Sequence, residues 1–167
     1  ERVQREVVAR EASLPDVMER RQLQVGIQAS EERFRALVQN ASDVIAVINT
    51  VGEFEYLSPS VETQLGYRPD ELVGKSGFSL VHPDDLATVH AAFASVVQRT
   101  NPGTPTEYRF RHAGGEWVVV ESVARNLLDQ PAVGGIVLTT RVITERRQAE
   151  AELRESRSRW LDAIDGY

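Results

Sequence analysis

Residues 106–128 form the pattern that most constrains the fold of this chain. The segment TEYRFRH (106–112) alternates polar and apolar residues, Gly114-Gly115 follows, and the chain returns through EWVVVESVARNLL (116–128). Alternation with a period of two places one set of side chains on a core and the other set in solvent. A glycine pair between two such segments is typical of a tight turn. These residues therefore predict an antiparallel β-hairpin.

Three other segments have the composition of strands. They are DVIAVIN (43–49), EFEYLS (53–58) and GGIVLTTRVI (134–143). Short helical pieces are expected over residues 59–79. PDD (83–85) then predicts the start of a longer helix, because a proline in the first turn loses no hydrogen bond and the two carboxylates face the positive end of the helix dipole. This helix is expected to end at 101–103. The predicted fold class is α+β, with a five-stranded antiparallel sheet and helices on one face.

Both ends of the chain are predicted to be helical. Residues 1–40 are rich in Glu, Arg, Gln and Ala, and Pro15 predicts a break between one helix over about 2–12 and another over about 15–38. The apolar positions of the second helix are sparse, so it is either a solvated helix with a few core contacts or a helix that pairs with its copy as a coiled coil. From Thr144 a long charged helix follows the last strand directly.

These patterns divide the chain into three parts. We expect an N-terminal helical linker or dimerisation segment (1–29), a central domain (30–143) and a C-terminal linker helix (144–167) that leads to a further domain. The sequence has no apolar run of about 18–20 residues and no signal-peptide layout, so we expect a cytoplasmic fragment without a membrane segment.

The composition excludes several kinds of site. The chain has no cysteine, which excludes disulfides, thiolate metal sites, cysteine nucleophiles and a flavin bonded to a thiol. Its formal net charge of -6 argues against nucleic-acid binding, because phosphate contacts need a surplus of Lys and Arg on one face. No phosphate-binding loop and no catalytic arrangement is present, so we expect no enzymatic activity in this segment.

The order of the segments resembles a PAS domain over about residues 30–155. The resemblance is carried by SEERFRALVQNASDVIAVI at the start, YLSPSVETQLGYRPDELVGKS in the short helices, LVHPDD before the long helix, EYRFRHAGGEWVVVES in the hairpin and ITERRQAEAEL at the exit. The hairpin resembles the subclass whose sequence ends in a PAC motif. The resemblance implies a non-catalytic sensor that dimerises within a multidomain bacterial-type signalling protein.

The resemblance also implies how the signal leaves the domain. In the family the signal passes through the last strand into the next helix, and the corresponding residues here are Arg141, Val142, Ile143 and Thr144. The family usually has Asp-Ile-Thr at this point, and Val142 replaces the aspartate, so the carboxylate hydrogen bonds of that junction cannot form. Arg141 or Glu145 is a candidate substitute. The implied output domain in the same chain is a histidine kinase of a two-component system, a cyclic-dinucleotide enzyme or a phosphatase.

The residues GGEW (114–117) superficially match the active-site loop of diguanylate cyclases, but they do not predict that activity. The aromatic residue directly after Glu116 does not fit that loop, and no further nucleotide-binding residues follow. A weak internal repeat instead relates the segment from Ser30 to the segment from Ser156. We hypothesise that Ser156 begins another sensor domain, although two unrelated amphipathic helices explain the match equally well.

A ligand pocket is expected between the sheet and the long helix if this space is hollow. The predicted lining, taken from inward strand positions and the facing helix, is Ile45, Val47, Phe78, Leu80, Val89, His90, Phe93, Tyr108, Phe110, Val118, Val120, Ile136 and Leu138. Most of these residues are aliphatic or aromatic, which favours a small apolar ligand. A packed core without a cavity is equally consistent with them, and the domain would then be a protein-interaction or dimerisation module.

Two histidines near the start of the long helix have different expected roles. We expect His82, directly before Pro83, to cap the helix. His90 lies one residue past Val89 and has the same spacing from the proline as the proximal histidine of haem-binding PAS oxygen sensors, so haem is an alternative cofactor with His90 as its axial ligand. Thr106 stands where those sensors carry the arginine that contacts bound gas. Flavin is not expected, and no metal site is predicted apart from the haem alternative.

Overall fold

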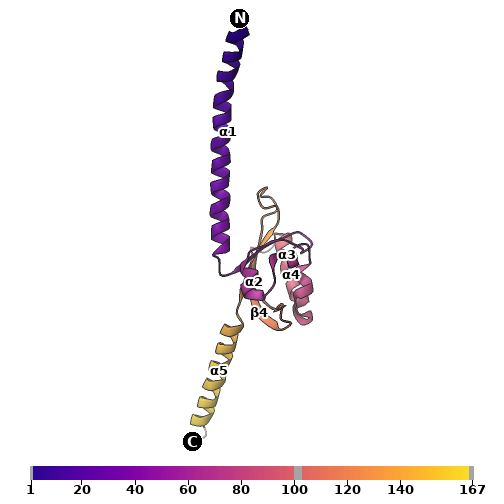
Figure 1. Cartoon of the computed structure of the whole chain (residues 1–167). Helices are drawn as coiled ribbons and strands as arrows, with labels where there is room; N and C mark the ends of the chain where they lie inside the picture. The colour runs from indigo at the N-terminus through magenta and orange to yellow at the C-terminus, as the bar shows by residue number, and fades with distance from the viewer. Residues whose placement is uncertain (1, 100–102, 166–167) are drawn as a thin grey trace. The chain divides into compact units, whose positions relative to one another are not determined.

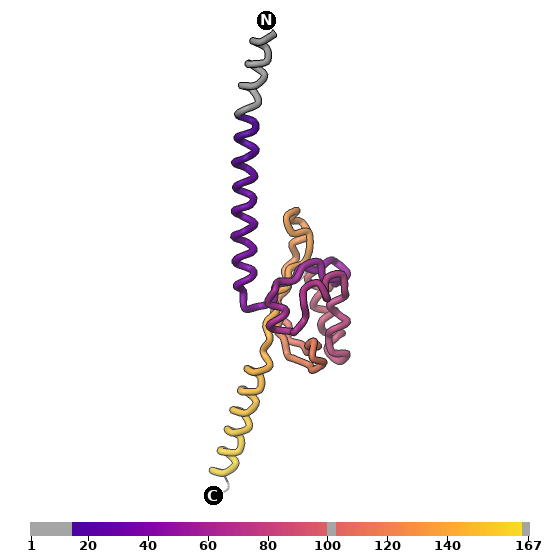
Figure 2. Tube along the Cα trace, in the orientation of Figure 1, coloured from indigo at the N-terminus to yellow at the C-terminus, as the bar shows by residue number. Residues whose placement is uncertain are grey.

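A computed structural model describes residues 2–99 and 103–165 of the chain (Figures 1 and 2). The chain falls into two units, residues 1–40 and residues 41–167. The first unit is the helix α1 (Arg2–Gln39). The second contains, in order, β1 (Val44–Ile48), β2 (Phe54–Leu57), α2 (Ser60–Leu65), α3 (Pro69–Leu72), the 3-10 turns η1 (Gly77–Leu80) and η2 (Pro83–Asp85), α4 (Leu86–Val97), β3 (Thr106–Arg111), β4 (Trp117–Asn126), β5 (Ile136–Val142) and α5 (Thr144–Asp165).

The five strands form one antiparallel sheet in the order β2-β1-β5-β4-β3, which confirms the predicted fold class. The predicted hairpin is β3–β4, in register from Thr106 opposite Ser122 to Arg111 opposite Trp117. The last strand, β5, lies between β1 and β4, so it contacts both halves of the sheet. α4 packs on β3 and β4, α2 on β1 and α3 on β2 (Figure 1).

The core lies on the face of the sheet that these helices cover. Val120 of β4 and Ile136 of β5 are fully buried, as is Val61 of α2. Each such side chain contributes about 1.5–3 kcal/mol by leaving water. Buried residues of the strands and the short helices form one cluster, so a single core holds the sheet and its helices together.

Two expectations about helices were wrong. α1 is one helix with Pro15 inside it, not two helices separated there. A proline removes one internal hydrogen bond, but helix-forming residues on both sides continue the helix past it. The longer helix begins as the 3-10 turn η2 and is α-helical only from Leu86 to Val97. Asn101 and Pro102, which were expected to end it, lie outside the described residues.

Among the residues that the structure describes, no helix combines the length and the apolar character needed to cross a membrane. The division of the chain at residues 29/30 and 143/144 stays a prediction.

Candidate ligand cavity and signal exit

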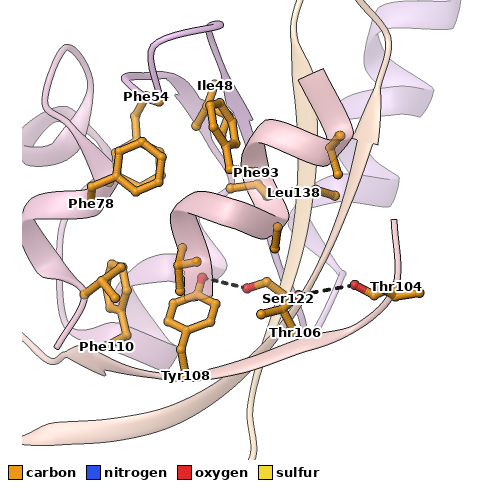
Figure 3. Close-up of a pocket in the computed structure, with 17 residues that line it drawn as sticks. Ile48, Phe54, Phe78, Phe93, Thr104, Thr106, Tyr108, Phe110, Ser122 and Leu138 are labelled. Atoms are coloured by element: carbon orange, nitrogen blue, oxygen red, sulfur yellow. Dashed lines mark hydrogen bonds between the residues drawn. The ribbon is translucent and has the colours of Figure 1, made fainter. Parts of the chain in front are cut away.

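A partly open cavity of about 80 Å³ lies between the sheet and α4 (Figure 3). Its walls come from the β1–β2 hairpin, η1, α4 and strands β3 to β5. The lining residues are Ile48, Gly52, Phe54, Gly77, Phe78, Val81, Val89, Ala92, Phe93, Val96, Thr104, Thr106, Tyr108, Phe110, Ser122, Ala124 and Leu138. None of them is charged. Because an unpaired charge is costly to remove from water, the cavity suits an uncharged ligand.

Aromatic rings form much of the wall. The rings of Phe78 and Phe93 meet edge to face with centroids 5.3 Å apart, and those of Tyr108 and Phe110 do so at 6.5 Å. Phe54 is buried beside them. Figure 3 shows Phe54, Phe78 and Phe93 around the upper part of the space and Tyr108 and Phe110 below it. Such surroundings favour apolar or aromatic ligands.

Three hydroxyl groups form a polar cluster at one side of the cavity. Tyr108 Oη lies 2.8 Å from Ser122 Oγ, and Ser122 Oγ lies 2.7 Å from Thr140 Oγ1. Tyr108 and Ser122 line the cavity, whereas Thr140 is buried and does not line it. Burial raises the pKa of the Tyr108 phenol, and the nearby hydroxyls of Ser122 and Thr140 lower it in part. The phenol is therefore neutral at physiological pH and can donate a hydrogen bond.

α4 is fixed at both ends, which holds this wall of the cavity in place. At its start, Asp85 accepts hydrogen bonds from the Arg109 backbone N, Nε and Nη2 at 2.8–2.9 Å. These hydrogen bonds lower the pKa of Asp85 from 3.8 to about 2. At its end, the side-chain amide of Asn126 donates to the carbonyls of Val96 and Val97, both at 3.1 Å.

The structure places the predicted pocket residues in three groups. Phe78, Val89, Phe93, Tyr108, Phe110 and Leu138 line the cavity. Leu80, Val118, Val120 and Ile136 belong to the surrounding core instead. Ile45, Val47 and His90 are in neither group. Whether the lining residues bind a ligand stays a prediction.

The assignment of Ile45 and Val47 to the cavity wall was wrong, because the inward-facing residues of β1 are shifted by one position from the predicted set. The buried positions of β1 are Val44, Ala46 and Ile48, and Ile48 lines the cavity. Every residue of VIAVI is apolar, so the sequence does not show which set points inward, and a shift of one residue exchanges the two faces. Ser122 and Ala124 were missed although the period of two from Val118 and Val120 predicts them, because they are not large apolar residues.

His90 is corrected as a cavity residue. It is exposed, and its ring stacks on Phe78 with centroids 4.0 Å apart, outside the lining. One residue of a helix rotates the side chain by about 100°, so the position after Val89 turns away from the cavity. A cavity of about 80 Å³ with His90 outside it does not fit haem, since even pockets for drug-sized ligands measure about 300–1,000 Å³. Within the described residues, no group of three or more His, Asp or Glu side chains is placed to hold a metal.

His82 has the capping role expected from its position. Its Nδ1 accepts a hydrogen bond from the backbone N of Asp84 at 3.1 Å, at the start of η2. Its ring lies against the edge of Trp117, with centroids 4.7 Å apart. His82 therefore joins the start of the α4 region to β4.

The junction of β5 and α5 is held by backbone groups and one hydroxyl. Ile143 N donates to Val119 O, and Val119 N donates to Thr144 Oγ1, both at 2.8 Å. Val142 packs against the core and pairs with Val120. Thr144 thus makes the side-chain hydrogen bond of this junction.

Charged side chains add a second set of contacts. Arg141 forms a two-point ion pair with Asp43, at 3.0 and 2.9 Å, so it joins β5 to the residue before β1 instead of replacing the missing aspartate. On α5, Arg147 contacts Glu107 of β3, and Arg146 lies 3.7 Å from Glu107 and 4.0 Å from Glu121 of β4. The first turn of α5 is therefore tied to β3 and β4.

The chain is similar to several known proteins. A family model described as PAS fold matches residues 54–133. An uncharacterized protein of Sinorhizobium fredii is 33% identical over 144 residues, which are 84% of this chain and 17% of that protein. Blue light receptor lreA of Aspergillus flavus is 47% identical over 55 residues, which are 33% of this chain and 6% of the receptor. The chain thus spans less than a fifth of either relative.

A solved structure is similar over most of the chain. It is the sensory box histidine kinase/response regulator from Burkholderia thailandensis, with 28% sequence identity and a TM-score of 0.58. The match covers 78% of this chain and 98% of that structure.

Proposed function

The chain contains a PAS domain, and on that premise we propose that it binds a small apolar ligand and relays binding through α5 to an output domain. Relatives named as a light receptor and a sensory box kinase support signal sensing as the general role of the domain. The observation that carries the ligand part is the uncharged, largely aromatic cavity of about 80 Å³. That volume is about half of an engineered cavity of about 150 Å³ that holds benzene, so the ligand is small or the cavity expands to admit it.

The relay part of the proposal follows from the position of β5. This strand contributes Leu138 to the cavity and leads through Ile143 directly into α5. A ligand that shifts β4 or β5 acts on the hydrogen bonds between Val119 and Thr144. Binding then shifts the equilibrium toward a second position of α5. The size of the shift equals the difference in the ligand's binding free energy between the two states.

The ion pairs of the first turn of α5 suit such an equilibrium. The side chains of Arg146 and Arg147 are about half exposed. Ion pairs at the surface typically contribute about 0–1 kcal/mol each to stability. Contacts of this strength hold α5 in one position but can be broken by a modest binding energy. A small ligand therefore suffices to move the equilibrium.

We propose further that two copies pair through α1. Leu23, Ile27, Phe34 and Leu37 follow one another at spacings of four, seven and three residues, which is the a/d pattern of a coiled coil. Each of them is 58–67% exposed in the single chain. Pairing with a second copy removes this apolar seam from water, and the hydrophobic free energy of that burial favours the dimer over the single helix in solvent.

The dimer is tested by a charge placed on the seam. Ile27→Glu with Phe34→Glu is expected to convert dimers to monomers in sedimentation analysis, because it puts carboxylates in the paired face. Val25→Glu is the matched control, since Val25 is 64% exposed but lies off the seam. A double variant that stays as dimeric as the control would contradict pairing through α1.

The ligand and relay parts are tested with toluene as a probe and amide NMR as the readout. Toluene is expected to shift the amide signals of Phe78 and Leu138, and also those of Ile143 and Thr144 at the exit. Ala92→Leu is expected to abolish both responses, because Ala92 lines the cavity and leucine fills it. Shifts limited to the cavity would refute the relay. No shift at saturation would refute ligand sensing and favour an interaction module with a filled core.

A further inference from the structure

We infer that the Tyr108–Ser122–Thr140 cluster recognises one polar group on an uncharged ligand about the size of a single ring, and that it transmits ligand binding to β5. This inference rests on the proposed function, since it names the ligand class and the coupling route of the same cavity. The three residues come from three neighbouring strands, β3, β4 and β5. Ser122 pairs directly with Thr140 across β4 and β5, and Tyr108 reaches Ser122 diagonally from β3.

The hydrogen-bond count of the cluster leaves one donor for a ligand. Three hydroxyl groups carry three hydrogens, whereas the two short contacts, at 2.8 and 2.7 Å, use two of them. The order of donors can run in either direction along the cluster. When it runs from Thr140 through Ser122, the hydrogen of Tyr108 is the one left over, and Tyr108 lines the cavity (Figure 3). A ligand oxygen that accepts this hydrogen fixes that direction.

The same arrangement carries the effect of the ligand out of the cavity. Thr140 does not line the cavity, is 8% exposed and contacts Ser122. A ligand that fixes the direction of the hydrogen bonds therefore changes the bond made by Thr140 without touching it. Thr140 precedes Val142 by two residues and the start of α5 at Thr144 by four. The cluster thus connects the cavity with the strand that leads into α5.

The rest of the cavity defines what else the ligand carries. The rest of the lining includes Phe54, Phe78, Phe93 and Leu138, and no lining residue is charged. A ligand with a net charge would leave that charge unpaired, and a purely apolar ligand would not use the one hydrogen that the cluster has left over. A single ring or short chain with one hydroxyl or carbonyl group satisfies both conditions.

Phenol and toluene are a matched pair of probes, since they have nearly the same shape and only phenol has an oxygen. The measurement is the ratio of their dissociation constants, Kd(toluene)/Kd(phenol), from NMR titration of the whole chain. Tyr108→Phe is expected to lower this ratio by about threefold to tenfold, which corresponds to one neutral hydrogen bond. Comparing ratios removes the different hydration of the two probes. Thermal unfolding verifies that each variant is folded.

Thr140→Val separates coupling from binding, because it removes only the hydroxyl of a residue outside the cavity. The variant is expected to keep phenol affinity within about threefold, while the phenol-induced shift of the Thr144 amide falls to the size that toluene induces. A ratio unchanged in Tyr108→Phe, or a full Thr144 shift in Thr140→Val, would overturn the inference and leave ligand sensing intact. Binding of neither probe to the wild type would instead overturn the proposed function, and the inference with it.

Discussion

Replacement of Asp85 by asparagine is predicted to destabilise the domain at neutral pH and to reduce its sensitivity to acid. The carboxylate of Asp85 accepts three hydrogen bonds from Arg109 and so fixes the start of α4 against β3. An asparagine side chain offers one acceptor oxygen and no charge. The variant therefore loses both the two-point contact with the guanidinium and the ionic attraction.

The size of the effect follows from the pKa of Asp85. A fall of the carboxyl pKa from 3.8 to about 2 corresponds to about 2.4 kcal/mol if it is transmitted fully to stability. The side chains of Asp85 and Arg109 are 23% and 40% exposed, so solvent screens the pair and the expected loss is about 1 kcal/mol. Because the pKa is lower in the folded state, this stabilisation is present above pH about 4 and is lost as the pH falls toward 2.

Urea unfolding followed by far-UV circular dichroism measures this loss at several pH values. Asp84→Asn is the matched control, since its carboxylate lies 3.8 Å from Arg109 Nη2 and is 76% exposed. The control is expected to change the free energy of unfolding by less than about 0.5 kcal/mol. The difference between wild type and Asp85→Asn should shrink between pH 4 and pH 2. Equal stability of the two variants at pH 7, or a difference that persists at pH 2, would refute the reasoning.

Three other changes test separate parts of the structure. Gly52→Ala is expected to cost more than about 1 kcal/mol in urea unfolding, because Gly52 has φ 85° and an added Cβ would lie 2.2 Å from the Phe78 ring; unchanged stability would contradict this close packing. Arg147→Gln is expected to speed amide exchange in the first turn of α5 at low salt but not at high salt, where its contact with Glu107 is already screened; equal acceleration at both would argue against an ionic contact. His90→Ala is expected to leave the absorption spectrum of protein mixed with haem unchanged, since His90 lies outside the cavity; a Soret band lost only in the variant would restore the haem alternative.

The sequence by itself determined the elements of the sheet and the largely apolar character of the side chains between the sheet and its helices. Alternation over 106–112, followed by Gly114-Gly115, predicted the hairpin of β3 and β4, and PDD (83–85) marked the start of the α4 region. Both signals are local, because they depend on backbone preferences and on neighbours within a few residues. Of the six predicted residues that line the cavity, the five on the strands and α4 follow from the periodicity of those elements.

Only the tertiary structure decided which faces and contacts carry the site. β1 reads VIAVI, so its inward set is fixed by pairing with β5, which placed Ile48 and not Ile45 or Val47 at the cavity. The spacing of His90 from Pro83 was evident in the sequence, but the direction of its side chain was not. The contact between Ser122 and Thr140, which are 18 residues apart in the sequence, depends on the register of β4 against β5. Such contacts are set by long-range pairing and packing, which local sequence preferences do not encode.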